Sequence, residues 1–374
     1  MKFSINSSLL SQRLQTLGRV INSKNAMPIL GNFLFKIADN VLTLTASDNE
    51  VYLTTTLELI ASDGELEFTV NAKTIQDAIK EIPEQPMEFD VDNSTLEITI
   101  GYQNGQYSLM GESAEAYPLA KPIEEDCSAL VINSQDLYSS INRALFATGD
   151  DQLRPVMNGV YFDYQTSGLS IVASDGRKLA CTRLFSLNAE QNNSFNLPKK
   201  PANIIKGILQ KEEQDITIRF SQRNAELTTE DYKMSCRLIE GKFPNYNSVI
   251  PQNNPNSMTV NRQSLISALR RILIFSNVGS PLVKLHIEAG RLEVSTKDMD
   301  YRRSGQESLL CEYDGAPMNI GFKGTLLVEL LNNLEDEEVI FRLADASRAG
   351  IIVPAQQDEN VEIVMLLMPM MLND

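Results

Sequence analysis

Apolar and polar residues alternate over much of the chain, as they do in strands with one buried face, and helical spacing interrupts this alternation six times. One strand-like pattern that ends in an Asp turn occurs three times, at residues 42–48, 169–175 and 292–298. The second and third occurrences begin 127 and 123 residues after the one before. A strand that ends on Asp is common, but three at a near-constant period predict a chain built of three copies.

Each copy is predicted to begin with a short strand and a helix, and to hold a second strand and helix further on. The apolar spacing places the first helices at residues 8–21, 134–147 and 261–274, and the second helices at 74–82, 201–209 and 324–334. Asn6, Asn133 and Asn261 precede the first helices, and Asn is a favoured N-cap residue. Lys73, Lys200 and Lys323 are expected at one equivalent position of the second helices.

The remainder of each copy alternates like antiparallel strands, for example at residues 87–100, 216–228 and 339–354. The sequence therefore predicts an α+β fold of three repeated domains, each with two helices packed on antiparallel sheets. We place these domains at residues 1–126, 127–252 and 253–374, each close to the usual size of one domain.

Composition narrows the class of protein. No window approaches the roughly 18 apolar residues of a membrane span, and the first residues lack the apolar region of a signal peptide, so we expect a cytoplasmic protein. The four cysteines, Cys127, Cys181, Cys236 and Cys311, stand far apart without CxxC spacing. This pattern favours free thiols over disulfides or a metal site.

The net charge of −16 is unevenly distributed along the chain. The six helical segments, taken as 8–21, 71–82, 134–147, 198–211, 261–274 and 323–334, carry thirteen basic residues and four acidic ones. The basic residues are Arg13, Arg19, Lys73, Lys80, Arg143, Lys199, Lys200, Lys206, Lys211, Arg262, Arg270, Arg271 and Lys323. The helices are therefore basic and the predicted sheets acidic.

A basic strip on an acidic body suits duplex DNA held by its phosphates without base reading. The acidic exterior would repel DNA from the other faces, so such a protein would cradle or enclose the duplex. The sequence has no Trp and few aromatic residues in these helices, which argues against a stacking platform for single strands. The alternative is chance segregation of charge on solvated helix faces.

Catalytic signatures are sparse. The single histidine, His286, lies inside a strand-like stretch, and no phosphate-binding glycine motif occurs. The acidic clusters at 48–50, 149–151 and 298–300 could suggest a two-metal nuclease. Two of these clusters fall at repeat-equivalent turns, which favours a role in turn formation. We therefore expect a non-enzymatic protein without a cofactor.

Several motifs together resemble one family. They are Met1–Phe3, Met27–Asn32, Arg154 with Asn158-Gly159, Ser174–Ala180, Gly241–Tyr246, Met318–Phe322 and Leu367–Met370. Each is weak alone, but together they are similar to the bacterial DNA polymerase III beta subunit family, the sliding clamps, from Met1 to Leu372. The resemblance implies a head-to-tail homodimer that closes into a ring around double-stranded DNA, with helices lining the hole. It also implies a processivity factor that recruits the DNA polymerase III core, the clamp loader, other polymerases and repair proteins.

The family's functional sites can be carried over by position. Its pocket for a partner's linear motif would be lined by Met157, Ser174, Gly176, Arg177, Leu179, Pro244, Ser248, Val249, Leu367, Met368, Pro369 and Met370. Its dimer contact would use Tyr107 and Leu109 of one subunit, and Ile274 and Phe275 of the other. The candidates for DNA contact are Arg13, Lys24, Lys73, Lys80, Arg143, Arg154, Lys199, Lys200, Lys206, Arg270, Arg271 and Lys323.

The chain departs from the family at two places near the expected pocket. Ser280 stands where the family has an aromatic residue, and Met371 stands where it has an Arg. Asp374 adds negative charge close by, so we expect acidic partner motifs to be less favoured than in the family. Two other functions stay open from the sequence: a repeat scaffold that does not encircle DNA, and the metal-dependent nuclease.

Overall fold

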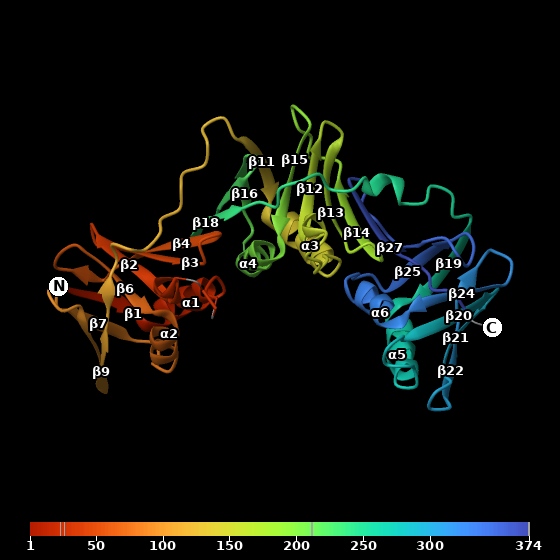
Figure 1. Cartoon of the computed structure of the whole chain (residues 1–374), viewed down its shortest axis with the longest axis horizontal. Coiled ribbons are helices and arrows are strands. Elements are labelled where there is room, and N and C mark those ends of the chain that lie inside the picture. The colour runs from red at the N-terminus through yellow and green to blue at the C-terminus, as the bar shows by residue number, and fades with distance from the viewer. Residues whose placement is uncertain (23, 26, 211, 373–374) are drawn as a thin grey trace. The chain divides into compact units, whose positions relative to one another are not determined.

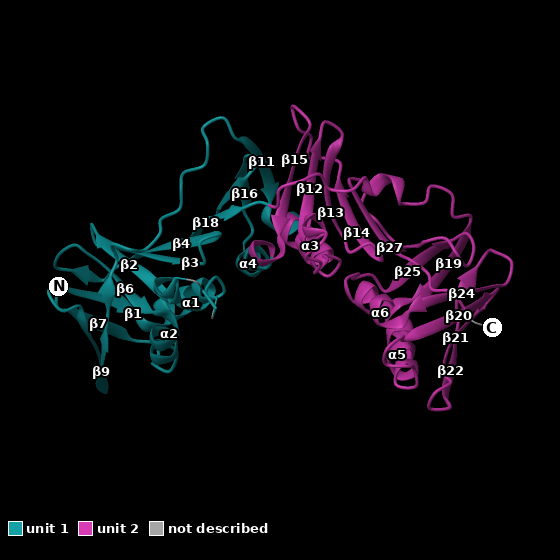
Figure 2. Cartoon of the chain, viewed as in Figure 1, with its two compact units in different colours: residues 1–136, 203–238 teal, residues 137–202, 239–374 magenta. Residues whose placement is uncertain are grey.

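The computed structural model describes residues 1–22, 24–25, 27–210 and 212–372, and Figure 1 shows its helices and strands. It divides into two compact units, residues 1–136 with 203–238 and residues 137–202 with 239–374 (Figure 2). In the described residues no helix is long and apolar enough to cross a membrane, and all four cysteines are free thiols, of which Cys127 is only half-buried.

Unit 1 holds two antiparallel sheets. The five-stranded sheet has the order β5 (Ala61–Ser62), β1 (Lys2–Asn6), β7 (Pro86–Val91), β8 (Glu97–Tyr102), β9 (Gly105–Met110). The nine-stranded sheet has the order β10 (Glu112–Ser113), β6 (Leu66–Asn71), β2 (Asn32–Ala38), β3 (Val41–Ser47), β4 (Val51–Glu58), β18 (Tyr232–Arg237), β17 (Asn224–Thr228), β16 (Asp215–Phe220), β11 (Ser128–Asn133). The helices α1 (Ser7–Gly18) and α2 (Ala72–Lys80) pack against each other, and the 3₁₀ turn η1 (Pro28–Gly31) precedes β2.

Unit 2 repeats this plan. Its nine-stranded sheet has the order β15 (Asn193–Pro198), β12 (Gly159–Gln165), β13 (Gly168–Ser174), β14 (Lys178–Leu184), β27 (Val361–Leu367), β26 (Gly350–Pro354), β25 (Glu338–Leu343), β19 (Asn256–Asn261), β23 (Glu312–Tyr313). Its four-stranded sheet has the order β22 (Arg303–Leu309), β21 (Arg291–Asp298), β20 (Leu282–Glu288), β24 (Met318–Lys323). Its other helical elements are η2 (Pro155–Met157), η3 (Tyr246–Ser248), α5 (Arg262–Leu273) and α6 (Gly324–Asn332), whereas α3 (Ser134–Leu145) and α4 (Lys199–Leu209) each have residues in both units.

The first helix of a copy begins where its sequence predicts. The Asn6 side chain accepts hydrogen bonds from the backbone N–H groups of Ser8 and Leu9 at the start of α1, and Asn261 accepts one from Ser264 at the start of α5. The apolar residues at helical spacing, such as Leu10, Leu14 and Leu17 of α1, are buried. Most predicted helix ends were too late: α1 ends at Gly18 rather than residue 21, and α3 ends at Leu145 rather than residue 147, whereas α4 ends at Leu209 as predicted.

The strand registers confirm three copies and align them residue by residue. In the hairpins that hold the Asp turn, Ala46 faces Leu53, Ala173 faces Ala180, and Thr296 faces Gly305. The first residue of each pair stands two residues before the Asp of its turn, in agreement with the alignment of the three Asp turns in the sequence. The boundaries at residues 126 and 252 remain predictions.

One expected equivalence is wrong by two residues. Asn71, Pro198 and Lys323 each end the strand before the second helix and pair with Asn32, Gly159 and Leu282 respectively. Lys73 and Lys200 are instead the second residues of α2 and α4, where α6 has Thr325. Lys323 is the N-cap of α6, because the third copy is two residues longer between the Asp of its turn and the end of this strand.

Candidate functional site

The turn between β13 and β14 is held rigidly by its own side chains. The Ser174 hydroxyl donates to the carbonyl of Lys178 and accepts from the backbone N–H of Gly176. One Asp175 carboxylate oxygen accepts from the N–H groups of Arg177 and Lys178, at 2.8 and 2.9 Å. Gly176 has a φ of +88°, which glycine adopts without a steric penalty. The turn therefore presents its backbone in a fixed geometry.

Arg154 and Met157, at η2, lie over this turn. A Cβ added at Gly176 would stand 3.0 Å from an Arg154 guanidinium nitrogen and 3.9 Å from the Met157 methyl carbon. The Arg154 guanidinium donates to a carboxylate oxygen of Asp151 at 2.9 Å and lies 3.4 Å from the carbonyl oxygen of Asp175. Glycine at position 176 is thus required by close approach as well as by its backbone angle.

The chain that leaves β18 and reaches β19 packs on the face of β12, β13 and β14. Phe243 stacks on Tyr161 with ring centroids 4.6 Å apart, and the Tyr246 hydroxyl donates to Asp163 at 2.7 Å. Burial, together with that carboxylate, raises the pKa of Tyr246. These anchored rings leave Pro244, Ser248 and Val249 exposed, and Val249 keeps 55% of its surface accessible.

The last described segment completes the site. Leu367 pairs with Lys178 at the end of the β14–β27 ladder, and the Met368 N–H donates to the carbonyl of Arg177 at 2.8 Å. Two residues later, Met370 forms a bridge to Gly321 of β24, so the tail runs from one sheet of unit 2 to the other. Met368 is 44% exposed, whereas Leu367 is buried.

These elements bring the sequence-predicted pocket residues together in unit 2. Met157, Leu179 and Leu367 are buried, while Met368 and Val249 are exposed. Leu179 packs in the cluster that contains Phe243 and Tyr246, whereas Leu367 belongs to the core on the other face of the sheet. Flexible methionines and aliphatic side chains over a rigid backbone suit an apolar peptide better than a reaction. We name this group of residues, 157, 174–179, 244–249 and 367–370, the tail pocket. Ser280 lies exposed in the loop between α5 and β20, where Asn277 accepts its backbone N–H.

Sequence reasoning missed the residues that brace the tail pocket. The Lys178 ammonium donates to Glu329 of α6 at 2.6 Å and lies over the Phe146 ring, so a nearly buried lysine ties β14 to α6. Phe243 and Tyr246 hold the loop that carries Pro244 and Val249. The only signal in the sequence was their place inside the family motifs, which does not distinguish supporting residues from contacting ones.

The basic residues proposed for DNA contact differ in accessibility. Lys24, Lys73, Lys80, Lys199 and Arg270 are exposed, and Arg143, Lys200, Lys206 and Lys323 are partly buried. Lys211, which the charge count includes, lies outside the described residues.

Several of these basic residues already have partners on the protein, among them Arg13, Arg154 and Arg271. Arg13 is only 8% exposed, forms an ion pair with Asp231, and lies over the Tyr232 ring, so it is unsuited to phosphate contact. Arg154 forms an ion pair with Asp151 and lies over the turn between β13 and β14. Arg271 forms a two-pronged ion pair with Glu307, which lowers the pKa of that carboxyl group.

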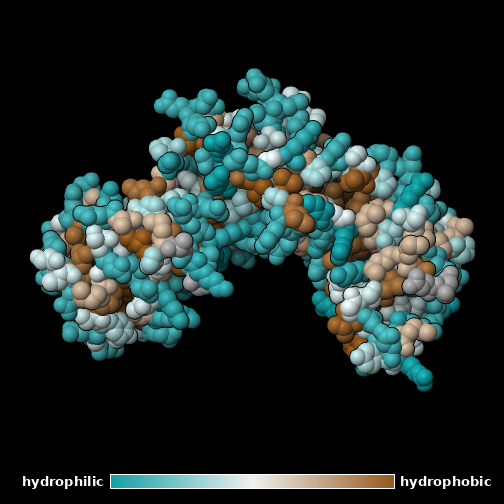
Figure 3. Space-filling view, in the orientation of Figure 1, coloured by the Kyte–Doolittle hydropathy of each residue, from teal (hydrophilic) through white to brown (hydrophobic). Residues whose placement is uncertain are grey.

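The proposed dimer residues lie beside open sheet edges. Tyr107 and Leu109 are on β9, the last strand of the five-stranded sheet in unit 1. Ile274 and Phe275 follow α5 in unit 2 and are 69% and 42% exposed. Figure 3 shows hydrophobic surface on the part of unit 2 that holds α5 in Figure 1. The Phe275 ring lies 3.1 Å from where a Cβ of Gly305 would be, on β22, the last strand of the four-stranded sheet.

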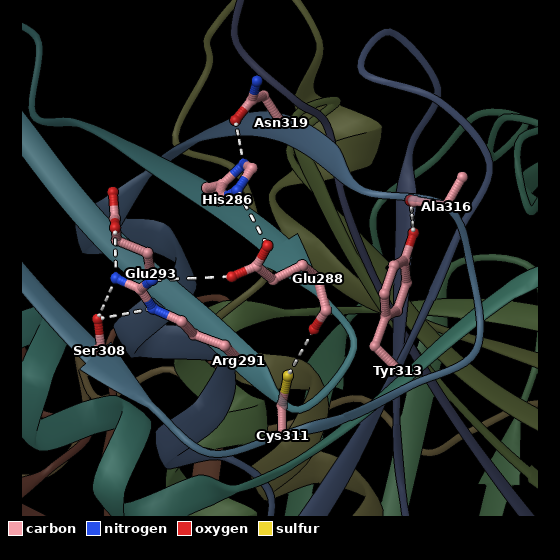
Figure 4. A network of polar contacts seen from close by, with 9 residues as sticks. All are labelled: His286, Glu288, Arg291, Glu293, Ser308, Cys311, Tyr313, Ala316 and Asn319. Carbon is pink, nitrogen blue, oxygen red and sulfur yellow. Dashed lines mark hydrogen bonds and ion pairs between the residues drawn. The ribbon is translucent and has the colours of Figure 1, made fainter.

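The acidic turns are engaged in turn formation. One carboxylate oxygen of Asp48 accepts from the N–H groups of Glu50 and Val51, and one of Asp298 accepts from Asp300 and Tyr301. Among the described residues, no group of His, Cys, Asp and Glu has the arrangement of a metal site. His286 lies 2.9 Å from the Asn319 side-chain oxygen on the outer face of β20 (Figure 4). The turn interpretation of these clusters is therefore supported by direct contacts.

The three copies correspond to three known domains. Residues 1–121 match the N-terminal domain of the DNA polymerase III beta subunit, residues 131–245 its central domain, and residues 247–371 its C-terminal domain. The chain belongs to the DNA polymerase III beta subunit family. This confirms the resemblance seen in the sequence motifs.

Relatives and solved structures agree over the full length. A beta sliding clamp of Pseudomonas putida is 27% identical over 98% of this chain and 99% of its own, and one of Haemophilus influenzae is 27% identical over both whole chains. Sliding clamp structures from Pseudomonas aeruginosa, with a ligand, and from Bartonella birtlesii, bound to griselimycin, each superpose with a TM-score of 0.92 at 25% identity and cover both chains completely.

Proposed function

We propose that this protein is a processivity clamp: a head-to-tail homodimeric ring that encircles duplex DNA and tethers replication and repair proteins through the tail pocket. It works without catalysing a reaction, in the cytoplasm. Polymerases and the clamp loader would insert an apolar linear motif beside Met368 and Val249. The family assignment supports the function, and one feature of the strand pairing supports the ring.

That feature is a pair of edges left open by the repeat. The first copy is joined to the second by pairing of β4 with β18, and the second to the third by pairing of β14 with β27. The equivalent strands of the third and first copies are β22 and β9, and each is the last strand of its sheet. A second molecule can pair its β9 with β22, and the same contact then repeats and closes the dimer.

The two internal junctions also predict the register of this third one. Leu53 faces Met234 at the first junction, and Ala180 faces Met365 at the second. The residues in the same positions are Gly305 of β22 and Tyr107 of β9. Tyr107 would then lie across from a glycine, with the Phe275 ring beside both. An aromatic residue opposite a strand glycine covers backbone that would otherwise be exposed.

Engineered cysteines test this register. In the predicted pairing Ser304 faces Ser108 of the second molecule, so Ser108→Cys with Ser304→Cys, in a Cys127→Ser background, should form a covalent dimer under mild oxidation. Directly opposed residues have Cα atoms about 4.5–5.5 Å apart, within disulfide range. The matched control is Ser108→Cys with Ser308→Cys, which displaces one cysteine by four residues, about 13 Å. Equal cross-linking of both pairs would contradict the register, and a monomer in sedimentation would contradict the ring.

DNA contact rests on basic residues that keep accessible surface. Lys73 and Lys200 occupy the same position at the start of their helices. Lys24, Lys199 and Arg270 are three further basic residues that are exposed. Such residues neutralise phosphates without reading bases, so binding should not depend on sequence and should weaken as salt rises.

A further inference from the structure

The outer face of the four-stranded sheet in unit 2 contains a cavity of about 740 Å³. It crosses three strands, with Lys284 on β20, Ser295 and Lys297 on β21, and Ser304 and Gln306 on β22. The cross-strand pairs Lys284–Ser295, Ser295–Gln306 and Lys297–Ser304 place these side chains in two adjacent rows. We name these residues the outer groove.

The equivalent faces of the other two copies are covered by the chain itself. By strand register, Lys284 corresponds to Leu34 in the first copy and Tyr161 in the second. Leu34 is buried in a cluster with Tyr117, from the segment that leaves the first copy. Tyr161 is covered by the stacked ring of Phe243, from the segment that leaves the second. Both faces therefore bind a stretch of polypeptide through aromatic side chains.

The third copy keeps this face open along the described chain. After β27, the tail turns to β24 through the Met370–Gly321 bridge, and Leu372 alone of its residues lines the cavity. The surface that receives a peptide segment in the first two copies is thus accessible in the third.

Its chemistry also differs from that of the covered faces. Within the described part of the chain, the cavity lining contains two lysines and no acidic residue, although the whole chain has a net charge of −16. Among the described residues, neither Lys284 nor Lys297 has an ion pair or a side-chain hydrogen bond. The neighbouring rows behave differently: Arg291 lies 3.0 Å from Glu293 and 3.7 Å from Glu288, and its guanidinium also donates to Ser308 (Figure 4).

We propose that the outer groove is a second docking site, for an extended acidic segment of a partner protein. Two unpaired ammonium groups in a concave site on an acidic protein favour an anionic ligand. Hydroxyl and amide groups of Ser295, Ser304 and Gln306 can donate to its carboxylates. Leu282 and Leu372, which lie together over Gly321, give the cavity an apolar region that suits aliphatic side chains of a peptide and has no counterpart in a nucleic-acid backbone.

The outer groove and the tail pocket share no residues, but some of their residues occupy equivalent positions in the third and second copies. Lys297 and Ser304 hold the positions that Ser174 and Leu179 hold at the tail pocket. A partner could thus bind with an apolar motif at one site and an acidic segment at the other. Binding at either site would raise the effective concentration of the partner at the other.

Fluorescence polarisation of the full-length protein tests the proposal, with a labelled eight-residue peptide of alternating acidic residues and leucines as probe. Binding is expected, and Lys284→Gln with Lys297→Gln should weaken it about tenfold, since each exposed charge contact contributes modestly. Lys284→Glu with Lys297→Glu should abolish it. The matched control is Lys36→Glu with Lys121→Glu, which makes the same charge change on exposed residues of unit 1.

Several outcomes would overturn the proposal. They are no binding to the unaltered protein, equal loss in the control, or equal binding of a probe with Asn and Gln in place of its acids. Displacement of the probe by a short single-stranded oligonucleotide at equal concentration would assign the groove to nucleic acid instead. A peptide carrying the apolar clamp-binding motif should bind the lysine variants normally, which keeps this test independent of the tail pocket.

Discussion

Phe275 is the single residue on which the proposed ring contact depends most. Its ring covers Gly305 at the open edge of unit 2 while keeping 42% of its surface accessible. Burying that remainder against Tyr107 of a second molecule would contribute roughly 1–2 kcal/mol per contact. A ring has two such contacts, so Phe275→Ala should raise the dimer dissociation constant by about 30-fold to 1000-fold.

Sedimentation velocity over a range of protein concentrations measures that constant. The matched control is Val278→Ala, because Val278 is the most exposed apolar residue of the same loop region and is not in the predicted contact. Its constant should stay within twofold of the parent. A Phe275→Ala protein that dimerises as tightly as the parent would place the interface elsewhere.

At the level of single residues, the sequence predicted which side chains have suitable chemistry for a contact better than it predicted which of them are accessible. Arg13 has the charge and helical position of a DNA contact, yet Asp231, 218 residues later, pairs with it. Lys323 has the spacing of an equivalent of Lys73, because both stand 25 residues after the Asp of their turns. The strand register, which a single sequence does not reveal, moves it to the N-cap of α6.

At the level of elements, the three Asp turns show why the sequence could predict the repeat. Each turn is closed by its own Asp side chain accepting backbone N–H groups, a local interaction that survives wherever the residues recur. Helix ends were predicted less well, because packing rather than local sequence decides where the last turn stops. The pairing of β4 with β18, and of β14 with β27, joins residues about 180 positions apart in the chain. No local pattern in the sequence predicts it.

The tail after β27 carries an element-scale prediction. Met368 is fixed by its N–H bond to Arg177 and exposes its side chain beside the buried Leu367. Met368→Ala should weaken binding of a labelled peptide with the polymerase's clamp-binding motif about 5- to 30-fold, because an apolar contact worth roughly 1–2 kcal/mol is lost.

Fluorescence polarisation against that one peptide measures this change. Met371→Ala, three residues further along the tail, is the matched control and should change affinity less than twofold. If both substitutions had the same effect, the tail pocket would not be the binding site. Deleting Asn373 and Asp374, which lie outside the described residues, is predicted to strengthen binding of a motif with acidic flanks slightly.

At the level of the whole molecule, retention on DNA by a closed ring and retention by charge contacts respond differently to salt. A protein held on DNA only by lysine–phosphate contacts dissociates at high salt, because counterions replace those contacts. A closed ring on circular DNA stays linked at any salt concentration that leaves its two dimer contacts intact. Loaded by its clamp loader onto nicked circular DNA, this protein should therefore survive a wash in about 0.5 M NaCl, and cutting the circle once should release it.

The Ser108→Cys with Ser304→Cys protein makes that experiment decisive. When it is cross-linked after loading, the protein should remain on the circle even in denaturant, because a covalent ring cannot leave closed DNA. When it is cross-linked before loading, the same protein should fail to load, because the ring can no longer open. Lys73→Glu with Lys200→Glu should lower the amount loaded but not the salt resistance of what has been loaded, since phosphate contacts assist entry whereas closure retains the ring. Equal retention on linear and circular DNA at high salt would exclude encirclement.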